Sequence, residues 1–145
     1  MSAGRICSRI VATAAPDEMV RAAAKRMAEH DVGTLVVVEP NDLHKPIGIL
    51  TDRDIAVRCV AKGLDPDKTA VSDVTSKPVQ SVDESTPIEE TVAKMAKTAT
   101  RRLVVTGTEN RLVGIVTLDD VMGLLTEEAA AISQLLGKQE PHIPA

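Results

Sequence analysis

The stretch Gly48-Ile49-Leu50-Thr51-Asp52-Arg53-Asp54-Ile55 carries a pattern that the chain uses twice. The same order of glycine, two aliphatic residues, threonine and, three residues later, aspartate returns 66 positions on, as Gly114-Ile115-Val116-Thr117 followed by Asp120-Val121. An aliphatic run that ends at a threonine, with an acid three residues further on, marks the point where a strand gives way to a helix. The chain is therefore expected to contain two copies of one structural unit.

The sequence that precedes the motif matches between the copies as well. Apolar residues at helical spacing recur 68 positions apart, as Val20, Ala24 and Met27 and then as Ile88, Val92 and Met95. A β-branched run follows each of these helices, at Leu35-Val36-Val37 and at Leu103-Val104-Val105. Each copy thus predicts a short strand near Val11 or Val79, a helix, two strands joined by a polar turn at 39–42 or 108–111, and a closing helix.

Local signals refine the helix ends. Thr86 is expected as an N-cap with Pro87 at the first helical position, and Gly63 is expected to end the closing helix of the first copy. Residues 64–78, with two prolines and several polar residues, predict an ordered connection that crosses from one copy to the other.

The repeat predicts an α/β fold of the α+β type. A unit of about 60 residues cannot cover its own apolar sheet face, so we expect two β-α-β-β-α repeats packed sheet to sheet about a pseudo-twofold axis. The first repeat is expected at 1–66 and the second at 67–125, with the connection at 64–78. Residues 126–145 are expected to hold a helical extension over 127–136 and a loose tail from Gly137 to Ala145. Such a pair leaves two equivalent clefts between the repeats, where small ligands bind.

Composition excludes several function classes. The 145 residues include no Phe, Trp or Tyr, and the formal net charge is −4, so neither base stacking nor a basic surface favours nucleic-acid binding. No apolar run reaches the roughly 18 residues of a membrane span, and the N-terminus leads into no signal-peptide apolar region, which predicts a cytoplasmic protein without membrane contact.

Side chains that commonly carry metal or covalent chemistry are scattered. Cys7 and Cys59 lie far apart and are expected to be reduced, packing thiols, and His30, His44 and His142 form no ligand spacing. The sequence therefore predicts no metal site, no nucleophile with a base and no enzyme.

The repeated Thr and Asp allow two interpretations. They form a capping box, in which the two side chains satisfy free backbone donors at the start of a helix. An ionised carboxylate there also suits the two adjacent hydroxyl groups of a ribose, and a threonine hydroxyl beside it adds a further polar group. Both interpretations predict the repetition, so the pattern alone does not separate them.

The doubled arrangement, with Gly-hydrophobic-hydrophobic-Thr-x-x-Asp closing each half, resembles a tandem pair of cystathionine-β-synthase (CBS) domains, the Bateman module, of the stand-alone bacterial or archaeal type. The resemblance covers residues from about Arg5 to Leu125. It implies a regulatory, non-catalytic sensor of AMP, ADP, ATP or S-adenosylmethionine that needs no other cofactor, forms a homodimer and acts on a protein in trans.

The resemblance also nominates ligand-binding positions. It implies that Asp54 and Asp120 bind the ribose, and that Thr51 and Thr117 lie beside the sugar and phosphate. It implies that the backbone around Thr13-Ala14 and around Ser81-Val82 receives the base.

The two copies differ where a phosphate would lie. The first motif holds Arg53, which suits a phosphate, where the second holds Asp119, which would repel one. Conversely, Arg101 and Arg102 occupy the second copy at the positions of Gly33 and Thr34, either as phosphate contacts or as a solvated basic face. The sequence therefore predicts two clefts of unequal nucleotide affinity.

A second function stays open at this point. The clefts could be vestigial, with the pair serving as a dimerisation or interaction scaffold and 127–136 as a contact helix. The sequence does not distinguish among the adenosyl ligands, and it does not identify the regulated protein.

Overall fold

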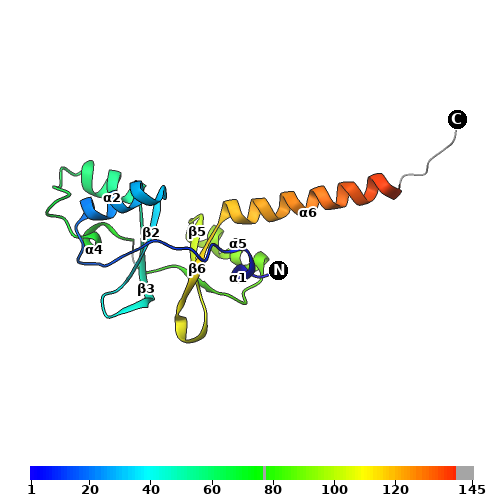
Figure 1. The fold of residues 1–145 in the computed structure, drawn as a ribbon, viewed down its shortest axis with the longest axis horizontal. Coiled ribbons are helices and arrows are strands. Elements are labelled where there is room, and N and C mark those ends of the chain that lie inside the picture. The colour runs from blue at the N-terminus through cyan, green and yellow to red at the C-terminus, as the bar shows by residue number, and fades with distance from the viewer. Residues whose placement is uncertain (77, 140–145) are drawn as a thin grey trace.

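The computed structural model describes residues 1–76 and 78–139. It contains two three-stranded sheets, in the orders β1-β2-β3 and β4-β5-β6 (Figure 1). The elements of the first repeat are β1 (Thr13–Ala14), α2 (Val20–His30), β2 (Thr34–Glu39), β3 (Asp42–Thr51), α3 (Asp52–Asp54) and the π-helical η1 (Ile55–Val60). Those of the second are β4 (Ser81–Asp83), α5 (Ile88–Thr98), β5 (Arg102–Thr106), the 3₁₀ turn η2 (Thr108–Asn110), β6 (Leu112–Thr117) and α6 (Leu118–Gln139).

Strand register confirms that the two repeats have one architecture. In each sheet the first strand runs parallel to the second, and the second runs antiparallel to the third. Thr13 pairs with Val36 and Ser81 with Val104, so both partners are shifted by the same 68 positions. The predicted β-α-β-β-α order is therefore correct for both copies.

The two sheets meet face to face through aliphatic side chains. Val36 and Val38 from the first sheet and Val104 and Ile115 from the second form one buried cluster. Because the chain has no aromatic residue, β-branched side chains on alternate strand positions fill this layer. The helices cover the outer sheet faces, where they close a separate core in each repeat.

The buried residues of α2 and α5 match the predicted apolar faces only in part, because on each helix one buried residue lies next to the residue that was predicted. Val20, Ala23 and Met27 are buried on α2, whereas Ala24 is half-buried. On α5, Thr91 and Met95 are buried, and the Thr91 hydroxyl donates to the Pro87 carbonyl at 3.0 Å. A buried threonine is tolerated because this bond satisfies its hydroxyl.

Each repeat is completed by a short helix that precedes the first strand of the other repeat. Helix α1 (Ala3–Ile6) contributes Ala3 to the core of the second repeat, and α4 (Val71–Val74) contributes Val71 and Val74 to the core of the first. Figure 1 shows the N-terminal chain crossing to lie beside α5 and β6. The repeat pattern of the sequence did not predict this exchange.

The exchanged segments explain the glycine of the repeated motif. Ser8 pairs with Ile115, and Ser76 pairs with Ile49, each as a single antiparallel bridge on the outer strand of a sheet. A Cβ at Gly114 would clash with the Ser8 carbonyl oxygen, and a Cβ at Gly48 would clash with the Thr75 methyl group. Glycine is needed at these positions because another segment of backbone approaches closely.

The start of α5 differs from the prediction. The helix begins at Ile88, and its N-cap is Pro87, which makes no side-chain capping bond, so Thr86 is not the N-cap. The Thr86 carbonyl instead accepts a bond from the Ala3 backbone N–H at 2.9 Å. The Met1 carbonyl accepts from the Ile88 N–H at 3.3 Å, so the exchanged N-terminal segment supplies an acceptor to the first turn of α5.

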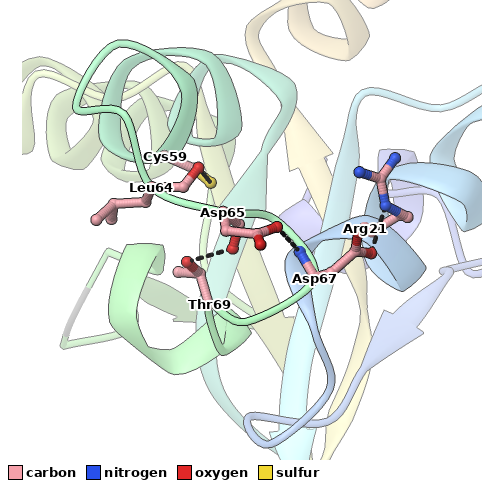
Figure 2. Close-up of polar contacts among 6 residues, drawn as sticks. All are labelled: Arg21, Cys59, Leu64, Asp65, Asp67 and Thr69. Atoms are coloured by element: carbon pink, nitrogen blue, oxygen red, sulfur yellow. Dashed lines mark hydrogen bonds and ion pairs between the residues drawn. The ribbon is translucent and has the colours of Figure 1, made fainter.

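The connection between the repeats is ordered by its own polar contacts, as expected (Figure 2). The Asp67 N–H donates to the Asp65 carboxylate at 2.9 Å, and the Thr69 hydroxyl donates to the Asp65 carbonyl at 2.8 Å. Arg21 of α2 forms an ion pair with Asp67. Gly63, at φ +70°, ends the helical segment before this loop, as predicted.

Helix α6 continues well past the second repeat (Figure 1). It includes 127–136 and runs on to Gln139, so the predicted loose tail does not begin at Gly137. The remaining part of that expected tail, 140–145, lies outside the described residues. In the part of the chain that the structure describes, no helix has the length and hydropathy needed to cross a membrane.

Candidate ligand site between the two repeats

Both copies of the repeated motif form complete capping boxes. The Thr51 hydroxyl accepts from the Asp54 N–H at 3.1 Å, while the Asp54 Oδ2 accepts from the Thr51 N–H at 2.9 Å. Thr117 and Asp120 form the same pair of bonds at 3.1 and 2.8 Å. The capping interpretation is therefore correct for both copies. It does not exclude ligand binding, because each box uses Oδ2 and a carboxylate has a second oxygen.

The first motif faces a cavity that both repeats line. Its volume is about 140 Å³, and Thr51 and Asp54 line it from the first repeat. The opposite wall comes from the connection and the second repeat. The other lining residues are Ile49, Ser76, Pro78, Val79, Gln80, Thr100 and Arg102. A hydroxyl, a carboxylate and a guanidinium thus line one space.

Arg102 is held at this cavity by the loop that follows α5. The Thr100 hydroxyl donates to the Arg102 carbonyl at 3.0 Å and accepts from the Arg102 N–H at 3.4 Å. Arg102 is half-buried, so its charge is partly shielded from water. Asp54 supplies acceptors only and Arg102 supplies donors only, an arrangement that suits a ligand with hydroxyl groups and an anionic group.

The second motif has different surroundings. Thr117 lines a separate hollow of about 140 Å³ together with Arg101, Arg102, Leu118 and Asp119. Asp120 is not among the residues that line it. Asp120 lies near the exchanged N-terminal segment, where burial raises the pKa of the Cys7 thiol and the Asp120 charge raises it further, against the lowering effect of Arg9.

The two motif carboxylates also differ in their charged neighbours. The Asp54 Oδ1 lies 3.8 Å from the Arg58 Nε, one helical turn further along η1. The corresponding position in α6 is Leu124, which has no charge. Arg58 is nearly half exposed, so this ion pair is weak and a competing ligand could displace it.

None of the four positions nominated for the base lines the cavity at Thr51 and Asp54. Pro78, Val79 and Gln80, just before Ser81 and Val82, line the wall instead. Thr13 and Ala14 line a larger cavity of about 640 Å³ along the edge of β1.

A cation from the following helix already binds a carbonyl of each first strand. Arg26 donates to the Thr13 carbonyl at 2.9 Å, and Lys94 donates to the Ser81 carbonyl. Arg26 also pairs with Glu18, which lowers the pKa of the Glu18 carboxyl. These contacts occupy the Thr13 and Ser81 carbonyls, so neither carbonyl is free for a ligand.

The remaining nominated arginines lie at the surface. Arg53 is exposed on the first turn after the first motif and does not line the cavity. Arg101 is also exposed, and it borders the hollow at Thr117. The structure thus brings Thr51, Asp54 and Arg102 together, and it leaves Arg53 apart from them.

Sequence reasoning missed several lining residues. Ser76 and Pro78 belong to the connection, and Thr100 belongs to a loop, where no periodic pattern marks a function. Their counterparts 68 positions earlier, Ser8, Ile10 and Val32, belong to no motif either, so the repeat offers no signal for them. Within residues 1–76 and 78–139, no group of three His, Cys, Asp or Glu side chains is placed to hold a metal ion.

Comparison with known proteins gives a consistent result. The family described as CBS domain matches residues 3–60 and 71–127. Hypoxic response protein 1 of Mycobacterium tuberculosis is 40% identical over 113 residues, which are 77% of this chain and 76% of that protein. A crystal structure of Hypoxic Response Protein I with two coordinated zinc ions, 36% identical, covers 84% of this chain and 97% of that chain, with a TM-score of 0.72.

Two further solved structures hold adenosyl compounds. The CBS domain pair of protein MJ0100, in complex with 5′-methylthioadenosine and S-adenosyl-L-methionine, is 26% identical and has a TM-score of 0.76, covering 88% of this chain and 98% of that one. The CBS domain protein PAE2072 from Pyrobaculum aerophilum, complexed with AMP, has a TM-score of 0.78 over 90% of this chain and 99% of that one. At 23% identity, this second likeness shows the fold alone.

Proposed function

The chain belongs to the CBS domain family, and from that premise we propose that it is a regulatory module that binds an adenosine-containing ligand between its two repeats. The ligand class is AMP, ADP, ATP or S-adenosylmethionine. The module acts by binding, not by catalysis, as a homodimer that signals to a protein in trans. The observation that carries the proposal is the cavity where Thr51 and Asp54 of one repeat meet Arg102 of the other.

The chemistry of that cavity matches a nucleoside monophosphate or a larger relative. The Oδ1 of Asp54, which the capping box leaves unused, accepts from ribose hydroxyl groups once they displace the weak Arg58 contact, and the Arg102 guanidinium binds a phosphate or carboxylate. Ile49 and Val79 supply aliphatic contacts for the base, since the chain has no aromatic ring for stacking. The 5′-methylthioadenosine and S-adenosyl-L-methionine bound by the CBS domain pair of MJ0100 support this ligand class.

The first cleft should be the tighter of the two. It combines the motif acid Asp54 with a half-buried arginine from the opposite repeat, whereas the hollow at Thr117 lacks Asp120 and places Asp119 beside Arg101 and Arg102. The negative charge of Asp119 offsets part of the attraction that these two arginines exert on a phosphate. We therefore propose unequal affinities.

Ligand binding should also move the repeats. A cavity of about 140 Å³ is smaller than the roughly 300 Å³ of a typical small-molecule site, so a nucleotide must widen the cleft to enter. The Val36, Val38, Val104 and Ile115 layer lies between the same two sheets and would have to adjust. We expect this change in sheet separation to transmit ligand binding to the surface of the module.

The test combines spectroscopy with calorimetry. The chain has no Trp or Tyr, so the pure protein should absorb weakly at 280 nm, and a co-purified adenine compound would be visible near 260 nm. Titration with AMP, ADP, ATP, S-adenosylmethionine and 5′-methylthioadenosine should then show saturable binding with two unequal sites. Equal sites would contradict the proposed asymmetry, and no binding of any of the five would contradict the proposal.

Substitutions of the motif acid separate capping from ligand binding. Asp54→Asn keeps a side-chain oxygen for the Thr51 N–H, so we expect near wild-type stability with affinity reduced at least tenfold, because the ribose loses a charged acceptor. Asp54→Ala should lose the cap as well, at about 1 kcal/mol of stability. Asp120→Asn is the matched control, because Asp120 does not line the cavity at Thr51, and it should leave the tighter site unchanged. Full nucleotide response in both Asp54 variants would overturn the site assignment.

Two observations favour a second candidate function. The cavity is small, and both motif acids already form helix caps. A scaffold with vestigial sites would use the same fold to present surfaces for dimerisation, and its motif acids would act as caps alone. This candidate predicts no adenine absorbance and no thermal shift with any nucleotide, whereas binding at 100 times the dissociation constant adds about 2.7 kcal/mol of stability.

A further inference from the structure

Helix α6 carries large apolar side chains that nothing in the described chain covers. Met122, Leu125, Ile132, Leu135 and Leu136 are each more than half exposed. From Leu125 to Lys138 every residue is exposed, because the helix has left the body of the second repeat (Figure 1). Isolated exposed aliphatic residues are ordinary, but several on one projecting helix mark an interaction surface.

Most of these residues form a single stripe. It consists of Leu118, Met122, Leu125, Ala129, Ile132 and Leu136, which we call the α6 stripe. The successive steps are four, three, four, three and four residues, the spacing of the core positions in a two-stranded coiled coil. Polar and charged residues at 126–128 and 133–134 lie beside the stripe or on the opposite face.

The stripe is symmetric about position 127. Leu118 and Leu136 are equally distant from that point, as are Met122 and Ile132, and Leu125 and Ala129. Two copies of α6 laid antiparallel with 127 on the axis therefore place every stripe residue opposite another stripe residue. A twofold axis produces this kind of self-complementary contact.

The body of the second repeat offers a seat for the end of a partner helix. A groove of about 380 Å³, the α5–α6 groove, lies where α5 meets the start of α6. Leu118 is both its lining residue and the first member of the α6 stripe. The other lining residues are Val92, Met95, Ala96, Ala99, Thr100 and Arg101.

We propose that α6 pairs antiparallel with α6 of a second copy, so that Leu136 of each copy enters the α5–α6 groove of its partner. The ligand proposal plays no part in this inference. It specifies the arrangement of the proposed homodimer, and its test measures association instead of nucleotide binding.

Charge placement agrees with the antiparallel order. Lys138 of one copy comes level with the first turn of its partner's α6, where Asp119 is exposed. Leu135, which lies outside the stripe, comes beside the start of the partner helix and finds apolar surface there. Only the Glu128 pair near the axis brings like charges together, and at an exposed position water and salt screen that repulsion.

The contact is large enough for a specific but modest dimer. The paired segment, 118–136, spans about 27 Å at 1.5 Å per residue. A large aliphatic side chain has roughly 60–120 Å² of apolar surface to bury, so ten half-exposed ones supply roughly 300–600 Å². The two grooves and the flanking side-chain stems bring the total toward the roughly 1,000 Å² of a specific interface.

Sedimentation equilibrium of the full chain tests the pairing. We expect a concentration-dependent monomer–dimer equilibrium for the wild type and at least a tenfold weaker dimer for Ile132→Glu. Ala131→Glu places the same charge at the adjacent residue, which faces away from the stripe, and should leave the dimer intact. Both positions are exposed, so neither change should alter folding, which circular dichroism would verify.

Cross-linking tests the helix direction. In the antiparallel pair position 128 lies near its own symmetry mate, so Glu128→Cys should give a 128–128 link with a short thiol-specific reagent, identified by peptide mass. Ala131→Cys should not link. A monomeric wild type, a dimer unaffected by Ile132→Glu, or efficient linking at 131 in place of 128 would each overturn the proposal.

Discussion

The two repeats share one backbone plan and one capping box, yet the first motif lines its cavity with both Thr51 and the capping acid Asp54, whereas the second motif lines its hollow with Thr117 but not with Asp120. The difference lies in what the opposite half contributes. Residues 78–80 and Arg102 line the cavity of the first motif from the connection and the second repeat, whereas the hollow at the second motif is lined by residues of the second repeat itself. A repeated motif therefore fixes the local structure, while the chemistry of each cleft depends on residues outside it.

The largest effect should come from the motif glycines, where the exchanged segments make their closest approach. At Gly114 the obstacle to a Cβ is the backbone carbonyl of Ser8, which cannot rotate away. At Gly48 the nearest obstacle is the Thr75 methyl group, with the Ser76 carbonyl at 3.2 Å. We expect Gly114→Ala to cost about 3 kcal/mol and Gly48→Ala about 1–2 kcal/mol, in urea denaturation.

Gly123 supplies the control for that comparison. It lies within α6, and a Cβ there meets no atom within 4 Å. Gly123→Ala should therefore stabilise the protein by about 0.5–1 kcal/mol through helix propensity. Equal losses of stability in Gly114→Ala and Gly48→Ala would mean that the two exchanged segments are packed alike, contrary to the structure.

A smaller difference in stability is expected between substitutions at the C-terminal ends of α2 and α5. Both helices end on a left-handed residue, Asp31 and Ala99, each at φ 52°. Aspartate tolerates this conformation better than alanine, because its side chain can form local hydrogen bonds. Ala99→Gly should stabilise the protein by about 0.5–1 kcal/mol in thermal or urea unfolding, and Asp31→Gly should change stability less. A larger gain at Asp31 would contradict this account.

The sequence was sufficient to predict much of the architecture. Apolar spacing and the repeated motif identified two β-α-β-β-α units, because periodicity of 2 or 3.6 residues reflects burial directly. It failed at the start of α5, since Thr86 has the right chemistry for a cap but is engaged by a segment 83 positions away. It also missed the exchange of α1 and α4, because helices of four residues have too little periodic pattern to reveal their partners.

The placement of a residue could be predicted where it follows from the residue's own motif. Thr51 and Asp54 form the expected box and line the cavity, which Arg102 also borders. Residues 78–80 and Thr100 were not found, because their position depends on how the two repeats are arranged in three dimensions. The ligand-binding roles of all these residues remain predictions for the titrations described above.

The smallest expected effect is a loss of stability at low pH. We expect this loss at β1 of the first repeat and not at β4 of the second. In the first repeat, the Arg26 contact to the Thr13 carbonyl is supported by Glu18, whose pKa is lowered chiefly by its hydrogen bond to Arg26. In the second repeat, Lys94 holds the Ser81 carbonyl, and Thr86 occupies the position of Glu18.

Because the Glu18 pKa is lower in the folded protein, its stabilising contribution is complete above the unfolded pKa of about 4.3 and is lost as the pH falls through the folded value. Wild type should therefore exceed Glu18→Gln in stability at pH 7, with the difference shrinking below about pH 4.3. The Glu18 carboxylate also accepts from the Ala15 N–H at 2.8 Å, so hydrogen exchange at Ala15 reports the loss locally. Exchange near Ser81 should not change over the same range. A stability difference that persists at pH 3 would show that Glu18 acts through packing, and the proposed contrast between the two strand ends would then rest on side-chain size instead of charge.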